Sequence, residues 1–259
     1  GELPMMRTLD KVVRFTHFGA FVEGTAMPPA LQGMLLAIDP LHNEVIAAQR
    51  EKKGATFTTH DHGIAVKSFD PAFRPVYIAN APDGSVFVSD MYEYYIAHGQ
   101  HYQNQIDPTS GRIYRISGVD SPLESDLDLA KKATTELVTF LAHPNKWHRQ
   151  TAVRLIGERE DPHAFPSLKQ FIISEPDIGA LNALWALYQS GGFDTAAAIH
   201  ALNHPFPPVR MWTTRLLGDS YGIHRNLGLA GEQIGARSLP EELFKTLIEQ
   251  AKVEPDAEV

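Results

Sequence analysis

Two stretches of the chain repeat one another and decide the fold of its C-terminal half. Residues 143–158 read HPNKWHRQTAVRLIGE, and residues 204–219 read HPFPPVRMWTTRLLGD. The His-Pro pair, the arginine six residues after the histidine and the ending Arg-Leu-aliphatic-Gly-acid all recur 61 residues apart. In both stretches the residues that would face a core recur at helical spacing, as Val209, Trp212, Thr213, Leu216 and Leu217 do. The repeat therefore predicts two equivalent amphipathic helices.

A third helix of this kind falls midway between them, at residues 183–187 (ALWAL). Shorter apolar segments precede each of the three, at 137–141, 168–172 and 199–202, and supply the first helix of each pair. Helix pairs at a period of roughly 30 residues are typical of an α-solenoid of HEAT type. One more amphipathic helix is predicted at 239–251, with Pro and two Glu in its first turn.

The first ~118 residues have the shorter period of β-strands. Turn residues such as Pro82-Asp83-Gly84 separate apolar or alternating runs, which predicts small antiparallel sheets. The polar, aperiodic segment 118–128 reads as a linker. We therefore expect a multidomain β plus α protein, with sheets over 1–120, a linker over 121–133 and helices over 134–259. The predicted strands are 33–39, 44–49, 76–80, 85–90 and 111–116.

Composition excludes several classes of function. The 259 residues carry a net charge of −8 and no run of five or six like charges, so nucleic acid is not an expected partner. The absence of cysteine excludes thiolate metal sites, cysteine nucleophiles and a C-x-x-C-H haem attachment site within these residues. Apolar runs such as 33–38 are far shorter than the ~20 residues of a transmembrane helix. The motifs of serine hydrolases, zincins, P-loop proteins and Rossmann enzymes are also missing.

A blade-like pattern adds a resemblance to a known family. Residues 73–76 (FRPV), 82–92 (PDGSVFVSDMY) and 111–116 (GRIYRI) resemble the final propeller blade of large planctomycete-type proteins classed as membrane-bound dehydrogenases. Residues 141–159 resemble the first HEAT-like repeat that follows that propeller, and the resemblance covers roughly residues 70–220. The propeller of that family is similar to the soluble quinoprotein sugar dehydrogenases, and a cytochrome c domain often follows the repeats.

The resemblance implies a partial β-propeller of about two blades followed by a HEAT-like α-solenoid. A propeller needs at least four blades, so a missing N-terminal propeller portion or another protein chain is the expected partner. A start at Gly1 rather than Met, with no signal peptide visible, agrees with a processed or excised piece. The family further implies a periplasmic or other extracytoplasmic location, PQQ and Ca²⁺ as cofactors, and a c-type cytochrome as electron acceptor.

Five residues are candidates for a site, and each has a simpler interpretation. His60 and His62 would point the same way from an extended segment, which suits a catalytic base or ligand, but they also suit a polar loop. Arg74, before a proline at the start of an inner strand, would bind an anionic cofactor or close the blade with a salt bridge. Asp90 and Tyr92 would offer oxygens to Ca²⁺, or Asp90 would bind backbone amides.

Weaker candidates lie outside this set. His98 and His101 sit in a long insertion before Asp107, where an H-x-x-H pair is equally typical of a polar loop. The recurring arginines and the His-Pro turns of the repeats are expected to have structural roles.

Two functions remain open from the sequence. The resemblance favours part of a quinoprotein-like dehydrogenase that oxidises a sugar or alcohol and passes electrons to a c-type cytochrome, with His60 or His62 as base. The residues themselves favour a non-catalytic propeller and HEAT scaffold that binds a protein partner within a larger complex.

Overall fold

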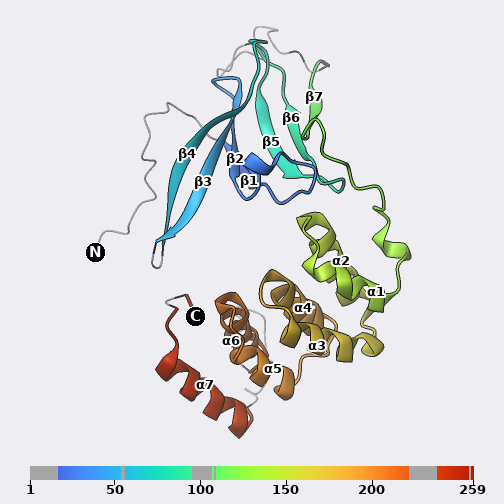
Figure 1. Ribbon diagram of the computed structural model, residues 1–259, viewed down its shortest axis with the longest axis vertical. Coiled ribbons are helices and arrows are strands. Elements are labelled where there is room, and N and C mark those ends of the chain that lie inside the picture. Colours follow the sequence, from blue (N-terminus) through green and yellow to red (C-terminus); the bar gives the residue numbers. More distant parts are fainter. Residues whose placement is uncertain (1–16, 54–55, 95–106, 108, 222–237, 257) are drawn as a thin grey trace, which may run out of the picture. The chain divides into compact units, whose positions relative to one another are not determined.

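The structure is a computed structural model that describes residues 17–53, 56–94, 107, 109–221, 238–256 and 258–259 (Figure 1). The chain divides into two compact units, the first holding residues 1–127 and 144–147 and the second holding residues 128–143 and 148–259. The described residues contain two small antiparallel sheets and seven α-helices, and the sheets do not close into a barrel. The predicted mixture of β and α structure is therefore confirmed.

The first sheet has four antiparallel strands that follow one another in sequence order. Its strands are β1 (Phe18–Phe21), β2 (Leu35–Asp39), β3 (Glu44–Lys53) and β4 (Thr56–Lys67). The sequence pattern predicted β2 and β3 and missed the other two. Strand β1 is only four residues long and contains a glycine, and β4 is largely polar with register shifts opposite Val45/Ile46 and Ala47/Ala48 that break its alternation.

The second sheet has three antiparallel strands, again in sequence order. They are β5 (Pro75–Asn80), β6 (Val86–Asp90) and β7 (Arg112–Ile116), and all three were predicted. The turn between β5 and β6 has the conformation that the sequence Pro82-Asp83-Gly84 predicts. Asp83 Oδ1 accepts hydrogen bonds from the backbone N–H and the hydroxyl of Ser85, and Gly84 adopts a φ of 85°.

One apolar core joins the two sheets. Strands β1 and β2 lie against β5, and side chains from facing surfaces of both sheets are buried together. Because Leu36 and Ile38 pair with Ala47 and Val45, these four side chains share one face of the first sheet. The buried members of this core are Val22, Met27, Leu36, Ile38, Val45, Ala47, Phe73, Ile78, Val86 and Val88.

Part of the segment predicted as a linker is hydrogen-bonded to the unit that holds the sheets. Gly118 N–H donates to Ala26 O at 2.8 Å, and Glu124 N–H donates to Asp83 O at 2.9 Å. The Glu124 carboxylate also accepts a hydrogen bond from Thr25 Oγ1 at 2.9 Å. Residues up to 127 therefore belong to the first unit.

Every predicted helix is present. The seven are α1 (Thr134–Thr139), α2 (Lys146–Arg159), α3 (Phe165–Ser174), α4 (Ile178–Gln189), α5 (Thr195–Leu202), α6 (Pro207–Tyr221) and α7 (Glu241–Val253). Helix α3 packs on α4 and α5 packs on α6, while α1, α3, α5 and α7 contact one another in series. Among the described residues, no helix is both long enough and apolar enough to cross a bilayer.

The recurring arginines lock the turns before the second helices. Arg149 Nη1 donates to the carbonyl of His143 at 2.8 Å, and Arg210 Nη1 donates to the carbonyl of His204 at 2.7 Å. The same bond thus forms twice, 61 residues apart, and in each turn it joins the histidine carbonyl to the helix that follows. The recurrence predicted a structural role for these arginines, and this is confirmed.

Candidate functional site

The candidate site lies where β5 begins and β6 ends, and Arg74 is at its centre. The side chain is 9% exposed, and its guanidinium donates to three backbone carbonyls: Glu93 O at 2.8 Å, Pro40 O at 2.8 Å and Tyr94 O at 3.1 Å. Burial lowers the pKa of Arg74, while the nearby Asp90 carboxylate acts in the opposite direction. The guanidinium therefore ties the β2–β3 turn to the segment after β6.

Asp90 holds the two backbone segments that flank Arg74. Its Oδ1 accepts a hydrogen bond from Arg74 N–H at 2.7 Å and another from Tyr92 N–H at 2.9 Å. Tyr92 has a φ of 56°, a conformation that a non-glycine residue rarely adopts and that this bond helps to hold. The structure thus brings three of the five predicted residues, Arg74, Asp90 and Tyr92, into direct contact, and Asp90 binds backbone amides as its simpler interpretation proposed.

One acceptor in this cluster has no partner among the described residues. Asp90 is 4% exposed, and its Oδ2 is buried without a hydrogen bond. Ca²⁺ takes six to eight oxygen ligands, yet the carbonyls of Pro40, Glu93 and Tyr94 already face the positive guanidinium of Arg74. Arg74 has committed all three of its nitrogens to these carbonyls. Binding of Ca²⁺ or PQQ stays a prediction from the resemblance.

Aromatic and cationic side chains pack on Tyr92 of this cluster. The guanidinium of Arg112 lies 4.4 Å from the centroid of the Tyr92 ring, and Tyr94 meets Tyr92 edge to face at 6.1 Å. Interaction with Tyr92, and then with Tyr114, raises the pKa of Arg112. The hydrogen bond with Tyr92 is the first cause that raises the pKa of Tyr94.

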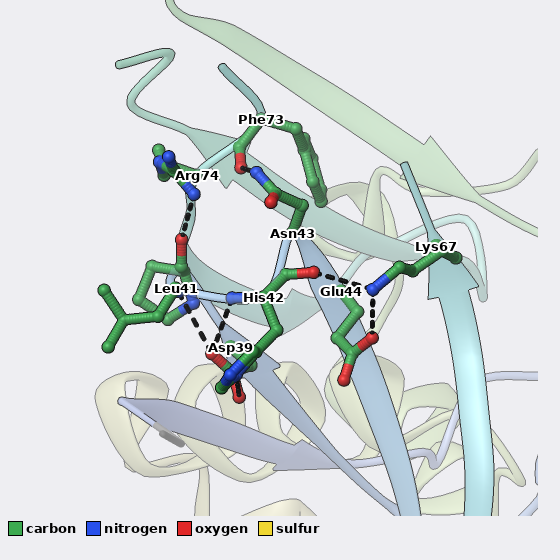
Figure 2. A network of polar contacts seen from close by, with 9 residues as sticks. Asp39, Leu41, His42, Asn43, Glu44, Lys67, Phe73 and Arg74 are labelled. Atoms are coloured by element: carbon green, nitrogen blue, oxygen red, sulfur yellow. Dashed lines mark hydrogen bonds and ion pairs between the residues drawn. The ribbon is translucent and has the colours of Figure 1, made fainter. Parts of the chain in front are cut away.

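The β2–β3 turn is joined to Arg74 through Pro40 and has its own polar contacts (Figure 2). These contacts were not predicted from the sequence. Asp39 is fully buried, and its Oδ1 accepts hydrogen bonds from the N–H groups of Leu41 and His42. Its Oδ2 lies 2.8 Å from His42 Nδ1. Asn43, at a φ of 60°, donates through Nδ2 to the carbonyl of Phe73. The sequence Asp-Pro-Leu-His-Asn at 39–43 is the signal that would have identified this turn.

Lys67 anchors the same turn from β4. Its Nζ donates to His42 O at 2.8 Å and to Glu44 Oε2 at 2.6 Å, and Figure 2 shows it reaching both. A pocket of about 290 Å³ lies nearby, with Phe73 and Tyr114 in its wall. These two rings meet edge to face at 5.7 Å.

The two predicted histidines lie elsewhere, on β4. His60 Nε2 is 3.1 Å from Glu51 Oε2 on the neighbouring strand, in a partly exposed pair. His62 is exposed and falls at a register shift, followed by Gly63 at a φ of 122°. No hydrogen bond or ion pair within the described ranges joins either histidine to Arg74. A catalytic role for His60 or His62 therefore stays a prediction.

The remaining weak candidates divide between described and undescribed residues. His98 and His101 lie outside the described residues. Asp107 is described, and its Oδ1 accepts hydrogen bonds from the N–H and hydroxyl of Thr109. Hydrogen bonds, first of all from Ser110, lower the pKa of Asp107. Its N–H in turn donates to Glu93 Oε1 at 3.3 Å, which places it beside the Arg74 cluster.

Comparison with known protein families finds a match over the part of the chain that forms the sheets. A family described as a domain of unknown function, DUF7133, matches residues 5–120, a range that contains both sheets and ends before the helices. No curated protein and no solved structure is significantly similar to the chain.

Proposed function

We propose that this chain is an assembly module of a larger extracytoplasmic dehydrogenase of the quinoprotein-like type. In this proposal its sheets are two consecutive blades of a β-propeller, and its helices are HEAT-like repeats that bind protein. The observation that carries the proposal is the strand order. Each sheet is built from strands in sequence order, and the first strands of the two sheets, β1 and β5, lie against each other. Successive blades around a central channel are related in this way.

The outward face of the second sheet supports the need for a further sheet. Tyr77, Phe87 and Ile113 share this face, because Tyr77 and Ile113 both pair with Ser89 and Phe87 lies two residues from it. They are 53%, 39% and 75% exposed. The opposite face of the same sheet is already buried in the core. A sheet with apolar side chains on both faces suits packing between two others.

The polar cluster supports an assembly role for this chain over a catalytic one. Arg74 and Asp90 direct their groups at backbone atoms of the chain itself, which holds turns in place. In the proposal the quinone and the oxidation of a sugar or alcohol belong to the complete propeller, and electrons pass on to a c-type cytochrome. The resemblance of residues 70–220 supports this part.

The test uses the protein isolated from its native source with whatever chains accompany it. We expect dye-linked oxidation of at least one member of a sugar and alcohol panel with added PQQ and Ca²⁺. The double variant F87K/I113K should lower that activity at least about tenfold by opening the proposed blade contact. Lys substitution of Phe69, which is 96% exposed and lies between β4 and β5, outside both sheets, is the control.

A second function is favoured by the same exposed face and would be recognised in the same experiment. If the native protein oxidises nothing on the panel and a stoichiometric partner accompanies it, the chain is a non-catalytic scaffold. Loss of that partner in F87K/I113K would then locate its binding face. An active enzyme whose activity is unchanged by F87K/I113K would contradict the blade contact.

A further inference from the structure

Helix α7 exposes two apolar side chains at positions that are buried in the helices equivalent to it. Counted from the first residue of each helix, the fourth and eighth positions of α7 are Phe244 and Ile248, which are 55% and 44% exposed. In the three earlier members of the series α1, α3 and α5, residues at the same positions are at most 2% exposed. These are Leu137 and Leu141 (the latter in the 3₁₀ turn Phe140–Ala142 that directly follows α1), Leu168 and Ile172, and Ala198 and Leu202.

The alignment of these positions is fixed by the neighbouring face of the helices. The third and seventh residues of α5 are Ala197 and Ala201, and those of α7 are Leu243 and Leu247. Leu243 is fully buried and packs with Ala198 and Leu202 of α5, so this face of α7 meets the preceding first helix. Phe244 and Ile248 therefore lie on the face of α7 that corresponds to the Ala198 and Leu202 face of α5. In α5 these two residues pack with Leu217 of α6.

The turn after α7 repeats the turn that leads from α3 into α4. Both read Glu-Pro-Asp, at 175–177 and at 254–256, immediately after the last helical residue. Asp177 caps the N-terminus of α4, and its Oδ1 accepts a hydrogen bond from Gly179 N–H at 3.3 Å. Asp256 Oδ1 accepts the equivalent bond from Glu258 N–H at 2.9 Å.

Two backbone bonds of the turns also match. In the first turn, Glu175 N–H donates to Phe171 O and Ala180 N–H donates to Asp177 O. In the second, Glu254 N–H donates to Gln250 O and Val259 N–H donates to Asp256 O. Asp256 thus has the hydrogen bonds of a helix N-cap. The Glu254 carboxylate is held by Arg210 of α6, through Nε at 2.7 Å and Nη2 at 2.6 Å, which fixes where the turn lies.

We propose that Phe244 and Ile248 are the docking site for one amphipathic α-helix, capped by Asp256 and packed on α7 as α4 packs on α3. The occupant is the second helix of a fourth pair, continuous in chain with the Asp256 turn. Its chemistry follows from α4, where Ala180, Ala183, Leu184 and Leu187 are all fully buried at i, i+3, i+4 and i+7. The proposal rests on the helical unit alone and holds whether or not the protein is a dehydrogenase.

The experiment joins a helix of this chemistry directly to the Asp256 turn of the chain. Residues 257–259 of the full chain are replaced by a second copy of residues 178–192, so that the α4 sequence follows Asp256 as it follows Asp177. Hydrogen–deuterium exchange then reports on the amides of α7. We expect them to exchange at least about tenfold more slowly than in the unmodified chain. A matched graft with Gln in place of the copied Leu184 and Leu187 should give no protection.

A second variant separates docking from a general effect of lengthening the chain. F244S/I248S leaves the α5-facing leucines of α7 untouched and should abolish the protection given by the intact graft. Protection by both grafts alike, or none by either, would overturn the proposal. So would light scattering that shows the unmodified chain to be a dimer broken by F244E, because a second copy would then be the occupant.

Discussion

The backbone N–H of Arg74 donates to Oδ1 of Asp90 at 2.7 Å and so fastens the start of β5 to the end of β6. The same oxygen accepts the N–H of Tyr92, which makes one carboxylate the common anchor of two segments. Asp90, at the end of β6, therefore helps to hold the two strands of the sheet together.

Removing this anchor should destabilise the first unit. We expect Asp90→Ala to lower the free energy of unfolding by about 2–4 kcal/mol, because one buried and one partly buried N–H donor lose a charged acceptor. Asp90→Asn keeps an acceptor oxygen and should cost about half as much. Urea unfolding with hydrogen exchange at β5 and β6 measures both. Asp120→Ala, at an exposed carboxylate, is the control, and equal losses in D90A and D90N would contradict the anchor role.

The guanidinium of Arg74 should matter for stability before it matters for any ligand. Arg74→Lys cannot reach three carbonyls in different directions, so we expect a loss of about 2–3 kcal/mol. Chemical denaturation of R74K measures it, beside PQQ binding by fluorescence titration. If stability stays within about 0.5 kcal/mol while quinone affinity falls, Arg74 is a ligand residue as the resemblance implies.

The elements that sequence reasoning found are those whose period is regular. The helix pairs were predicted from a 61-residue repeat, and β6 from the alternation in SVFVSD. Strand β4 was missed because its polar residues and the glycine at 63 hide the alternation. Arg74, Asp90 and Tyr92 could be singled out by residue type, but their partners are carbonyls and amides, which every residue carries. Asp39 and Asn43 were missed for the same reason.

A close approach of two backbone segments depends on Gly24. A Cβ there would lie well inside van der Waals contact of the carbonyl oxygen of Gly84, whose φ of 85° already excludes most side chains. We expect Gly24→Ala to lower the free energy of unfolding by at least about 2 kcal/mol. Gly218→Ala on α6, where a Cβ meets nothing within 4 Å, should instead be neutral or stabilise by up to about 1 kcal/mol. Thermal unfolding of the two variants tests the contrast, and similar melting temperatures would refute it.

The docking of α7 should depend on pH through Glu254. Both Arg210 and Glu254 have side chains only 11% exposed, and their hydrogen bonds lower the pKa of Glu254 and raise that of Arg210. Because the folded state lowers the pKa of Glu254, it binds fewer protons there than the unfolded state does. The stabilisation is therefore present above the ordinary glutamate pKa of about 4.3 and is lost as pH falls through the lower folded value. Exchange of α7 amides should accelerate in this acidic range, after correction for intrinsic rates.

Glu254→Gln should weaken docking by about 2 kcal/mol at neutral pH and remove that pH dependence. The control is Glu158→Gln, in the half-exposed Arg154–Glu158 pair, which should change the free energy of unfolding by less than about 0.5 kcal/mol. An effect as large as that of E254Q would show that burial of the Arg210–Glu254 pair is not what holds α7.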